Sequence, residues 1–527
     1  MIFGRIKPLE AMLEAAQERG LPRSLGPVQL TLLGVGAIVG TGIFVLTATA
    51  AQKAGPGMLL SFVIAGAICA CAALCYAEIA GMVPVSGSAY TYTYAVVGEL
   101  PAWMVGWALI LEYAVAASAV SVGWSGYFMG LLASATGFEL PPMLSAGPVW
   151  TLQGWAVHVD ISHGLINIPA MAVALSITAL LVLGTRESAL VNALLVAAKV
   201  GVLTVFIALT LPGIHQGNFT PFAPNGWFGP AQMGAASGLG SGLGIVGAAA
   251  SIFFAYVGFD AVSTAAEETR NPQRNVPIGL LGSLALCTLF YLLVSAGEIG
   301  AVGAQPVRGA GGAILAPGTA AFRQACSAAL HAGDLVCSNE ALAHVLRATG
   351  WQVMGNITGL AANLALPSVI LMMMFGQTRI FFVMARDGLL PGRLAAVHPR
   401  FGTPHVVTMV TGGFVAVVAA LLPVGKLVDI SNSGTLFAFL MVVVSVMALR
   451  LRDPGRARPF RTPWLWVVGP GTVLGCVALY LNLPWDAQMV LPVWGALGLL
   501  VYAGYGYRHS RVGRGAGGTP PAPRQGP

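Results

Sequence analysis

The chain has 527 residues, of which 56% are hydrophobic and 9% are charged, and its mean hydropathy is +0.79. Roughly a quarter of the residues in soluble domains are charged, so this composition excludes an ordinary soluble domain. The formal net charge of +7 comes from basic residues that lie between apolar segments. We interpret it as a membrane-topology signal rather than as a nucleic-acid signal.

Long apolar segments recur along the chain, and each can cross a hydrocarbon core of about 30 Å as a helix. Alternating strand patterns do not recur, which argues against a membrane β-barrel. We therefore predict an all-α polytopic membrane protein with twelve transmembrane helices. The predicted spans are 28–52, 57–83, 101–132, 164–184, 188–211, 242–268, 276–300, 352–384, 404–423, 428–449, 464–483 and 488–507.

Two groups of five spans, followed by two further spans, organise the chain. Its charged, amphipathic beginning lacks the continuous apolar region and the cleavage site of a signal peptide, and its end is rich in Gly, Pro and Arg. The predicted units are 1–25 as a cytoplasmic N-terminal segment, 26–211 as the first five-helix repeat, 212–241 as an external loop, 242–452 as the second five-helix repeat with the external segment 301–350 inside it, 453–507 as helices 11 and 12, and 508–527 as a disordered cytoplasmic tail.

Charge placement supports this arrangement. Twelve spans place both termini on one side of the membrane, together with most of the arginines. The basic residues that fall on the opposite side are Lys53, Arg308, Arg323, Arg347 and Lys426. The positive-inside rule makes the first side cytoplasmic. We therefore predict a multi-pass protein of the cytoplasmic (inner) membrane with both termini in the cytoplasm.

The first span contains the segment GVGAIVGTGIF, 34–44, which is unusually rich in glycine. Gly36 and Gly40 form a GxxxG pattern, which lets two helices approach closely. The same glycines could instead interrupt the helix, leaving free backbone N–H groups and a helix N-terminus that suit a carboxylate. The residues alone leave both interpretations open.

A second unusual segment, 251–273, crosses the sixth span, with Gly258 in its middle and Asp260 two residues later. An ionisable group at that depth is costly and marks a candidate functional site. Spans 1 and 6 each begin a group of five. Interrupted spans at corresponding places in two halves indicate a transporter built from inverted repeats.

Two further charges lie inside predicted spans. Lys199 is in span 5, where it either reaches an interface or sits buried, and a buried lysine loses its proton readily because burial disfavours the charge. Its distance from both ends of the span favours burial. Glu112, in span 3, either faces the same cavity as Asp260 or pairs with a neighbour.

The remaining reactive residue types do not form a catalytic site. Cys326 and Cys337 share the external segment, where a disulfide and two free thiols are both possible. The other cysteines lie in spans without the spacing of a zinc site, and the histidines fall in loops or at span ends. We therefore predict no enzyme activity, no metal, no cofactor and no nucleic-acid partner. A channel fits less well than a carrier, because interrupted helices imply that a bound solute is occluded.

Several motifs together resemble the amino acid–polyamine–organocation superfamily, and in particular bacterial relatives of its cationic amino acid transporters. They are GAIVGTGIF, FFAYVGFDAVSTAAEETRNPQRNVPIGL, SGSAYTYTYAVVGELPAWMVGWALILEYAVA, GQTRIFFVMARDGLLPGRLAAVHPRFGTP and DISNSGTLFAF. The resemblance covers about residues 25–505 in matching order. The sixth-span motif and RDGLLP are the specific parts, because the wider superfamily shares the glycine motif.

The resemblance implies a five-plus-five inverted-repeat fold, with broken helices 1 and 6 and two additional helices. It implies that the substrate α-carboxylate binds the backbone near Ile38, Thr41 and Gly42. It implies that the α-amino group binds carbonyl groups around Phe254, Ala255 and Val257, with Phe254 acting as a gate. In proton-coupled members of the family a span-5 lysine replaces a sodium ion, and Lys199 matches it. The expected coupling is therefore proton symport.

The substrate is less well defined. Asp260 could bind a cationic side chain, but members with the same FDAVST segment include carriers of small neutral amino acids. Asp260 could instead hold helix 6 together or serve the proton path. Asn363 and Pro367 depart from the family's helix 8, and Pro367 is expected to kink that helix. We expect a carrier that imports neutral or cationic amino acids by alternating access, in contact with membrane lipid. An amino acid exchanger and a non-transporting sensor of the same fold are the alternatives, and the sequence does not predict an oligomeric state.

Overall fold

The computed structural model describes residues 5–7, 25–82, 88–153, 156–162, 164–184, 189–229, 242–264, 269–309, 312–317, 319–327 and 334–515. Most of the predicted N-terminal segment 1–25, the second part of the predicted loop 212–241 and the tail after residue 515 lie outside these residues. The described chain is mainly helical, as the sequence predicts.

Seven helical stretches are long and apolar enough to cross a membrane within the described residues. They are Leu46–Met82, which combines α4 (Leu46–Ala54), η2 (Gly55–Gly57) and α5 (Met58–Met82); α7 (Glu99–Thr136); Ala193–Gly213, within α10 (Ala189–Thr210) and η3 (Leu211–Gly213); α13 (Pro272–Val302); α16 (Gln352–Arg386); α18 (Val424–Arg452); and Trp485–His509, which combines α20 (Trp485–Val501), the π-helical η11 (Tyr502–Gly506) and α21 (Tyr507–His509). The chain is therefore a multi-pass helical membrane protein.

Shorter apolar helices accompany these stretches. They are α2 (Pro27–Ile38), α9 (Ile168–Leu183), α11 (Gly244–Ile252) with η6 (Phe253–Tyr256), α17 (His405–Leu421) and α19 (Leu465–Leu481). Their lengths alone do not establish that each one crosses the membrane, because about 20 residues are needed for a full span. The count of twelve spans stays a prediction.

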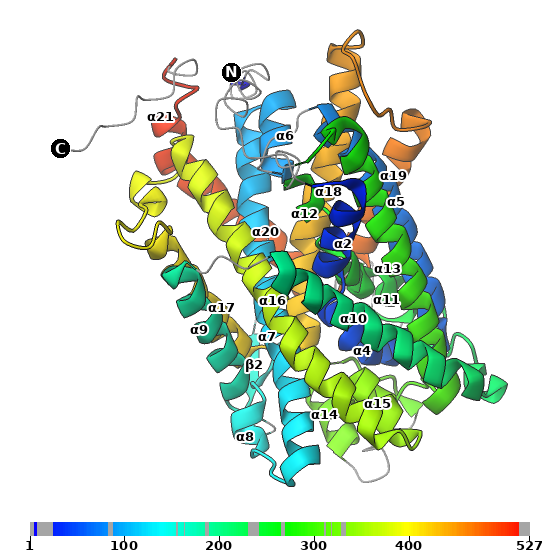
Figure 1. The fold of residues 1–527 in the computed structure, drawn as a ribbon. Coiled ribbons are helices and arrows are strands. Elements are labelled where there is room, and N and C mark those ends of the chain that lie inside the picture. The colour runs from blue at the N-terminus through cyan, green and yellow to red at the C-terminus, as the bar shows by residue number, and fades with distance from the viewer. Residues whose placement is uncertain are drawn as a thin grey trace.

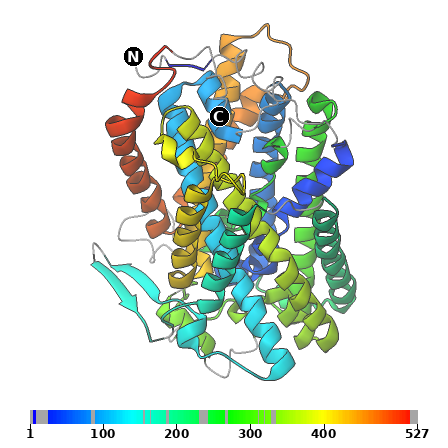
Figure 2. The ribbon, with the colours of Figure 1, turned by 60° about the vertical axis from the view of Figure 1, so that its left-hand side comes forward.

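The remaining elements are small. They are α3 (Thr41–Phe44), α6 (Ser88–Val96), α8 (Pro142–Ser145), η4 (Gln216–Phe219), α12 (Ala261–Thr264), α14 (Ala320–Ser327), η9 (Leu335–Cys337), α15 (Ala341–Ala348) and η10 (Gly392–Ala395). The strands β1 (Val149–Gln153) and β2 (Ala156–Asp160) form an antiparallel hairpin in which Val149 pairs with Asp160. This hairpin is an exception to the all-α prediction, and Figure 2 shows it projecting from one side of the helices.

The helices run roughly side by side in one bundle, with α6 and α21 at one end and α8, α14 and α15 at the other (Figure 1). The long helix α7 packs against α16 and α18, and α13 packs against α2 and α5. The short helices α4 and α11 pack against each other and against α5, since α11 contacts both α4 and α5. The interrupted segments are therefore held between long helices.

Two prolines inside helices have their lost hydrogen bonds replaced by side chains. Proline lacks an N–H, so the carbonyl group four residues earlier loses its helical donor. Pro367 frees the carbonyl of Asn363, which accepts a hydrogen bond from Trp124 Nε1 at 3.0 Å. Pro492 frees the carbonyl of Gln488, which accepts one from the Tyr480 hydroxyl at 2.6 Å. The helix α16 therefore continues through Pro367.

Candidate functional site

The glycine-rich segment of the first span is interrupted. The helix α2 ends at Ile38, Val39 is extended with φ −72° and ψ 97°, and a new helical turn begins at Thr41. The amides of Ile43 and Phe44 both donate to the Gly40 carbonyl, so the amides of Thr41 and Gly42 come first in the new helix. The first amides of a helix have no acceptor inside that helix and are available to an anion.

The same glycines also allow close packing. A β-carbon on Gly36 would lie 2.5 Å from Val196 Cγ2, and one on Gly40 would lie 3.3 Å from Val369 Cγ2. The two interpretations left open by the sequence therefore apply together, because the glycines bring α10 and α16 close to the point where the backbone is interrupted.

The sixth predicted span is also interrupted, at its middle. The α-helix α11 gives way to the tighter helix η6 at Phe253, and α12 begins at Ala261. Between them Gly258 has φ +109°, a left-handed conformation that favours glycine. A β-carbon on Gly258 would also lie 2.9 Å from the carbonyl oxygen of Ala37. Both the conformation and the space therefore require glycine at this position.

The two interruptions lie directly against each other. Gly258 contacts the end of α2, and Gly42 contacts Ala255, where a β-carbon on Gly42 would lie 2.3 Å from the Ala255 Cα. We call this meeting point the crossing. The residues to which the resemblance assigns substrate binding are brought together there and are buried: Ile38, Thr41, Gly42, Phe254, Ala255 and Val257.

One tyrosine joins the two interruptions. The hydroxyl of Tyr291, on α13, lies 3.0 Å from the carbonyl oxygen of Ile38 and 2.9 Å from that of Ala255. Its single proton serves these two acceptors, one from each interrupted span. Free carbonyl groups are what an interrupted helix exposes, and a buried carbonyl without a donor is costly. Tyr291 therefore stabilises both interruptions at once.

Some polar groups at the crossing are already paired and others are not. The carbonyl of Phe254 accepts from the amide of Val257 at 3.1 Å, and the carbonyl of Ala255 accepts from Tyr291. The hydroxyl oxygen of Thr41 is buried and has no hydrogen-bond partner among the described residues. Thr41 thus presents an unused donor and acceptor beside the first amides of the new helix.

Lys199 is buried, with 1% of its surface exposed, and so does not reach an interface. Its Nζ donates to the carbonyl oxygen of Gly36 at 3.0 Å and lies 3.5 Å from Ser368 Oγ. The lysine therefore links three elements, α10, the last turn of α2, and α16. A charged amine in that position replaces lost hydration with hydrogen bonds to polar oxygens.

Asp260, which follows Gly258 in the second interruption, and Glu112, on α7, are both buried. The hydroxyl of Tyr113, next to Glu112 on α7, donates to Asp260 Oδ2 at 3.3 Å. The Oε2 atom of Glu112 has no hydrogen-bond partner in the described part of the chain, whereas its backbone carbonyl accepts from Ser431 at 3.3 Å. The structure thus places two acidic residues near each other, with Tyr113 between α7 and the interruption.

A buried ion pair beside the crossing was not anticipated from the sequence. Lys53, expected on the external side, lies at the end of α4 with Nζ 3.0 Å from Asp429 Oδ2 on α18. Ser251 on α11 bonds to both partners, and Asn432 Nδ2 donates to the carbonyls of Ala250 and Ser251 at 2.7 and 3.0 Å. Lys53 and Asp429 lie close to predicted span ends, where charged side chains usually contact water. The sequence therefore gives no reason to predict that they form a buried pair.

In the segment 301–350, Cys326 at the end of α14 and Cys337 at the end of η9 form a disulfide, with 5.4 Å between their α-carbons. An ion pair between Glu340 and Arg347 follows on α15. The disulfide thus links two parts of this segment covalently, and η9 packs against α4.

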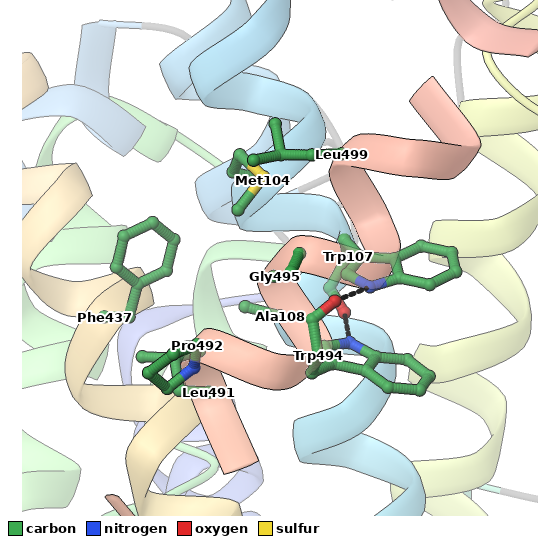
Figure 3. A pocket seen from close by; sticks show the side chains of 10 residues that line it. Met104, Trp107, Ala108, Phe437, Leu491, Pro492, Trp494, Gly495 and Leu499 are labelled. Carbon is green, nitrogen blue, oxygen red and sulfur yellow. Dashed lines mark hydrogen bonds between the residues drawn. The ribbon is translucent and has the colours of Figure 1, made fainter. Parts of the chain in front are cut away.

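A cavity of about 330 Å³ lies between α7, α18 and α20, away from the crossing. Figure 3 shows its lining, in which Trp107 and Trp494 stack at 4.8 Å and each indole N–H donates to the other residue's carbonyl at 2.8 Å. Its other lining residues are apolar, including Met104, Phe437 and Leu491. An apolar lining between helices suits hydrocarbon rather than a zwitterionic solute, so this cavity is not part of the candidate site.

Comparisons with known proteins identify the family of this chain. The family profile described as amino acid permease matches residues 25–502. The branched-chain amino acid permease BcaP of Bacillus subtilis is 41% identical over 509 residues, covering 96% of this chain and 98% of that protein. The methylthioribose transporter of the same organism is 37% identical over 97% of this chain and 99% of its own length. The mouse cationic amino acid transporter 4 is 33% identical over 89% of this chain and 65% of its own length.

The matched residues contain both interruptions, Lys199 and Tyr291. The chain belongs to the amino acid permease family.

Proposed function

We propose that this protein imports amino acids across the cytoplasmic membrane by alternating access, coupled to proton symport. In this proposal twelve spans form two inverted five-helix repeats and two further helices, and both termini are cytoplasmic. The observation that carries the proposal is the crossing, where interruptions in the first helix of each group meet between long helices. Paired interruptions near the middle of the membrane are how many carriers expose backbone groups to a solute.

The crossing suits the two ends of an amino acid. The first amides of the helix that starts at Thr41 attract a carboxylate, and the carbonyl groups around Ala255 attract an ammonium group. A carbonyl oxygen has two lone pairs, so Ala255 can accept from Tyr291 and from an ammonium group together. The proposed ligands are the backbone and side-chain groups of Ile38, Thr41, Gly42, Phe254, Ala255 and Val257.

We favour a neutral aliphatic side chain on the substrate. The relative named as a branched-chain permease is 41% identical, compared with 33% for a relative named as cationic. Asp260 already accepts a hydrogen bond from Tyr113, so its carboxylate is not held ready for a cationic side chain alone. Apolar side chains such as Val369 and Met373 lie buried on the helix next to Gly40. Glu112 and Asp260 then hold the interrupted segment in place or respond to protons.

Proton coupling is assigned to Lys199. Protonated, its amine donates to Gly36 and Ser368 and ties α2 to α10 and α16. Deprotonated, it has one donor fewer and no charge, so the attachment of α2 weakens. The proton thereby biases a two-state element, which is the requirement for coupling.

The experiment is uptake of radiolabelled leucine by proteoliposomes with an imposed inward proton gradient. Competition by unlabelled valine, arginine and methylthioribose then identifies the substrate. Uptake that valine suppresses and arginine does not supports the proposal. Arginine uptake that leucine cannot suppress contradicts the neutral assignment.

Methylthioribose is a second candidate substrate, because a transporter of that name matches this chain over nearly its whole length at 37% identity. Methylthioribose has no carboxylate, so it would not need the amides of Thr41 and Gly42. Suppression of leucine uptake by methylthioribose alone among the competitors would favour this candidate.

A further inference from the structure

Glu298 lies near the end of α13 with its side chain completely buried. Its Oε1 accepts a hydrogen bond from the Thr47 hydroxyl, on α4, at 2.8 Å. Its Oε2 is buried without a hydrogen-bond partner in the part of the chain that the structure describes. An ionised carboxylate here would exchange its hydration for one hydrogen bond, which is costly, whereas a neutral carboxylic acid avoids most of that cost. The surroundings therefore suit a protonated side chain.

Glu298 belongs to a polar stripe on one face of α13. Tyr291, Ser295 and Glu298 are spaced by four and three residues, which places them on the same side of a helix. All three are buried, and the Ser295 hydroxyl, like Glu298 Oε2, has no hydrogen-bond partner within the described chain. Tyr291 bonds to Ile38 before the interruption, and Glu298 bonds to Thr47 after it. The stripe therefore follows the first span across its interruption.

Ionisable groups lie on several of the elements that pack near Glu298. On α7, Tyr127 interacts electrostatically with Glu298 and with the Glu340–Arg347 pair of α15, and its hydroxyl donates to the carbonyl of Phe44 at 2.6 Å. The helices α2 and α12, which also pack on α13, contain no ionisable side chain. The remaining ionisable groups on elements packed against α13 are His215 before η4, His344 on α15, Lys199 on α10, Arg274, Cys287 and Tyr291 on α13 itself, and Cys69, Cys71, Cys75, Tyr76 and Glu78 on α5.

The nearest charged groups are committed elsewhere. Lys199 bonds to Gly36, and Lys53 on α4 is paired with Asp429. His215 is exposed, and its backbone amide donates to the carbonyl of Gly300 at 3.0 Å, just beyond Glu298. No described basic side chain is hydrogen-bonded to Glu298, so a proton is the available means of neutralising it.

We propose that Glu298 is a second proton-binding site of the transport cycle, which holds the outer half of the interrupted first span through Thr47. This rests on the proposed transport function. In this structure the acid form accepts a hydrogen bond from the Thr47 hydroxyl through Oε1, and its Oε2 has no partner among the described residues. The carboxyl group is fully buried, so it exchanges its proton with external water only when α4 moves away from α13. Loss of that proton disfavours the return of α4, because it would bury a charge.

In this proposal a different ionisable residue holds each half of the interrupted first span. Lys199 holds α2, before the interruption, from α10, and Glu298 holds α4, after it, from α13. Alternating access requires the two halves to move at different stages. Separate protonation sites make each movement respond to the pH on its own side.

The first test needs no substrate. Infrared absorption of purified protein contains a carbonyl stretching band for each protonated carboxylic acid. We expect the spectrum of the protein near pH 7 to contain an acid band that is missing in Glu298→Gln and present in Thr47→Val. Absence of a difference band between the unmodified protein and Glu298→Gln would mean that Glu298 is ionised, and would overturn the proposal. This result is independent of whether leucine is transported.

The second test measures leucine exchange in proteoliposomes with equal pH on both sides, so that no net proton flow is needed. We expect the half-saturation concentration of the unmodified protein to rise about fivefold or more across the pH range in which the infrared acid band of Glu298 disappears. We expect a clearly smaller rise over that pH range in Glu298→Gln, which mimics the neutral acid, and any rise that remains is due to other groups such as Lys199. The exposed Glu139→Gln is the matched control and should keep the full pH dependence.

An unchanged pH dependence in Glu298→Gln would contradict the proposal even if leucine exchange is normal. Exchange that is absent in the unmodified protein would instead contradict the proposed function, while the infrared result would still decide whether Glu298 carries a proton.

Discussion

Gly42 and Ala255, which are far apart in the chain, touch through their backbones at the crossing. A β-carbon on Gly42 would lie 2.3 Å from the Ala255 Cα, and backbone cannot rotate away as a flexible side chain can. This contact sets how closely the two interrupted spans approach. It also places the amides at the start of one helix beside the carbonyl groups at the end of the other.

Substitution of Gly42 by alanine should therefore separate the two interruptions. Overpacking of this kind costs about 1–3 kcal/mol, and the displacement would also move the proposed carboxylate ligands. We expect leucine uptake to fall by more than about tenfold, which corresponds to about 1.4 kcal/mol in the binding or transition state. Gly201→Ala is the matched control, because a β-carbon there meets no atom within 4 Å. Equal uptake by the two variants would contradict the role of the contact.

Removal of the Tyr291 hydroxyl should destabilise both interruptions. In Tyr291→Phe two buried carbonyl groups lose their shared donor, at a cost of about 1–3 kcal/mol. We expect a lower thermal unfolding midpoint in detergent and weaker leucine binding, because the carbonyl of Ala255 is a proposed ammonium ligand. Tyr480→Phe also removes a hydroxyl donor from a carbonyl, but far from the crossing, so it should lower stability without a specific loss of leucine affinity.

The Lys53–Asp429 pair should contribute strongly to stability when only one partner is removed. Both side chains are less than a tenth exposed, and leaving one buried charge unpaired costs about 3–5 kcal/mol. Asp429→Asn should therefore lower the free energy of unfolding by about this amount, and the double variant Lys53→Met with Asp429→Asn should recover part of the loss. The more exposed Lys426–Asp486 pair is the control, and Asp486→Asn should cost about 1 kcal/mol or less.

Trp124 and Pro367 should show coupled effects on stability. Trp124→Phe leaves the carbonyl of Asn363 without a donor, at a cost of about 1–3 kcal/mol. Pro367→Ala restores an N–H at the position that normally pairs with this carbonyl. We expect Trp124→Phe to be much less destabilising in the Pro367→Ala background. A double-mutant cycle on thermal unfolding measures this, and strictly additive effects would show that the indole does not replace the missing helical donor.

The sequence predicts those parts of the site that depend on residues within a single segment. Glycines at 36, 40, 42 and 258 stand out in apolar spans, and the left-handed Gly258 shows why a helix cannot continue there. Lys199 stands out because a charge in the middle of a span has few explanations, and the structure buries it. Each of these features depends on a residue type that is unusual in its own apolar segment. The sequence of that segment is therefore sufficient to predict it.

The parts that the sequence does not predict depend on partners far along the chain. Tyr291 is an ordinary residue of an apolar helix until its hydroxyl meets Ile38 and Ala255. Lys53, Asp429 and Glu298 lie near predicted span ends, where a charge usually contacts water, and only tertiary packing buries them. The hairpin of β1 and β2 is missed for a different reason, since two short strands between apolar spans have no extended alternation of their own.

In the proposed function, a proton on Lys199 drives substrate accumulation through the crossing. The most direct measurement compares leucine accumulation and leucine exchange in Lys199→Ala, in proteoliposomes with an inward proton gradient, with Lys426→Ala as the control for loss of a lysine. We predict that Lys199→Ala loses accumulation against a leucine gradient, while Lys426→Ala retains it. Undiminished gradient-driven accumulation in folded Lys199→Ala would contradict the assignment of proton coupling to Lys199.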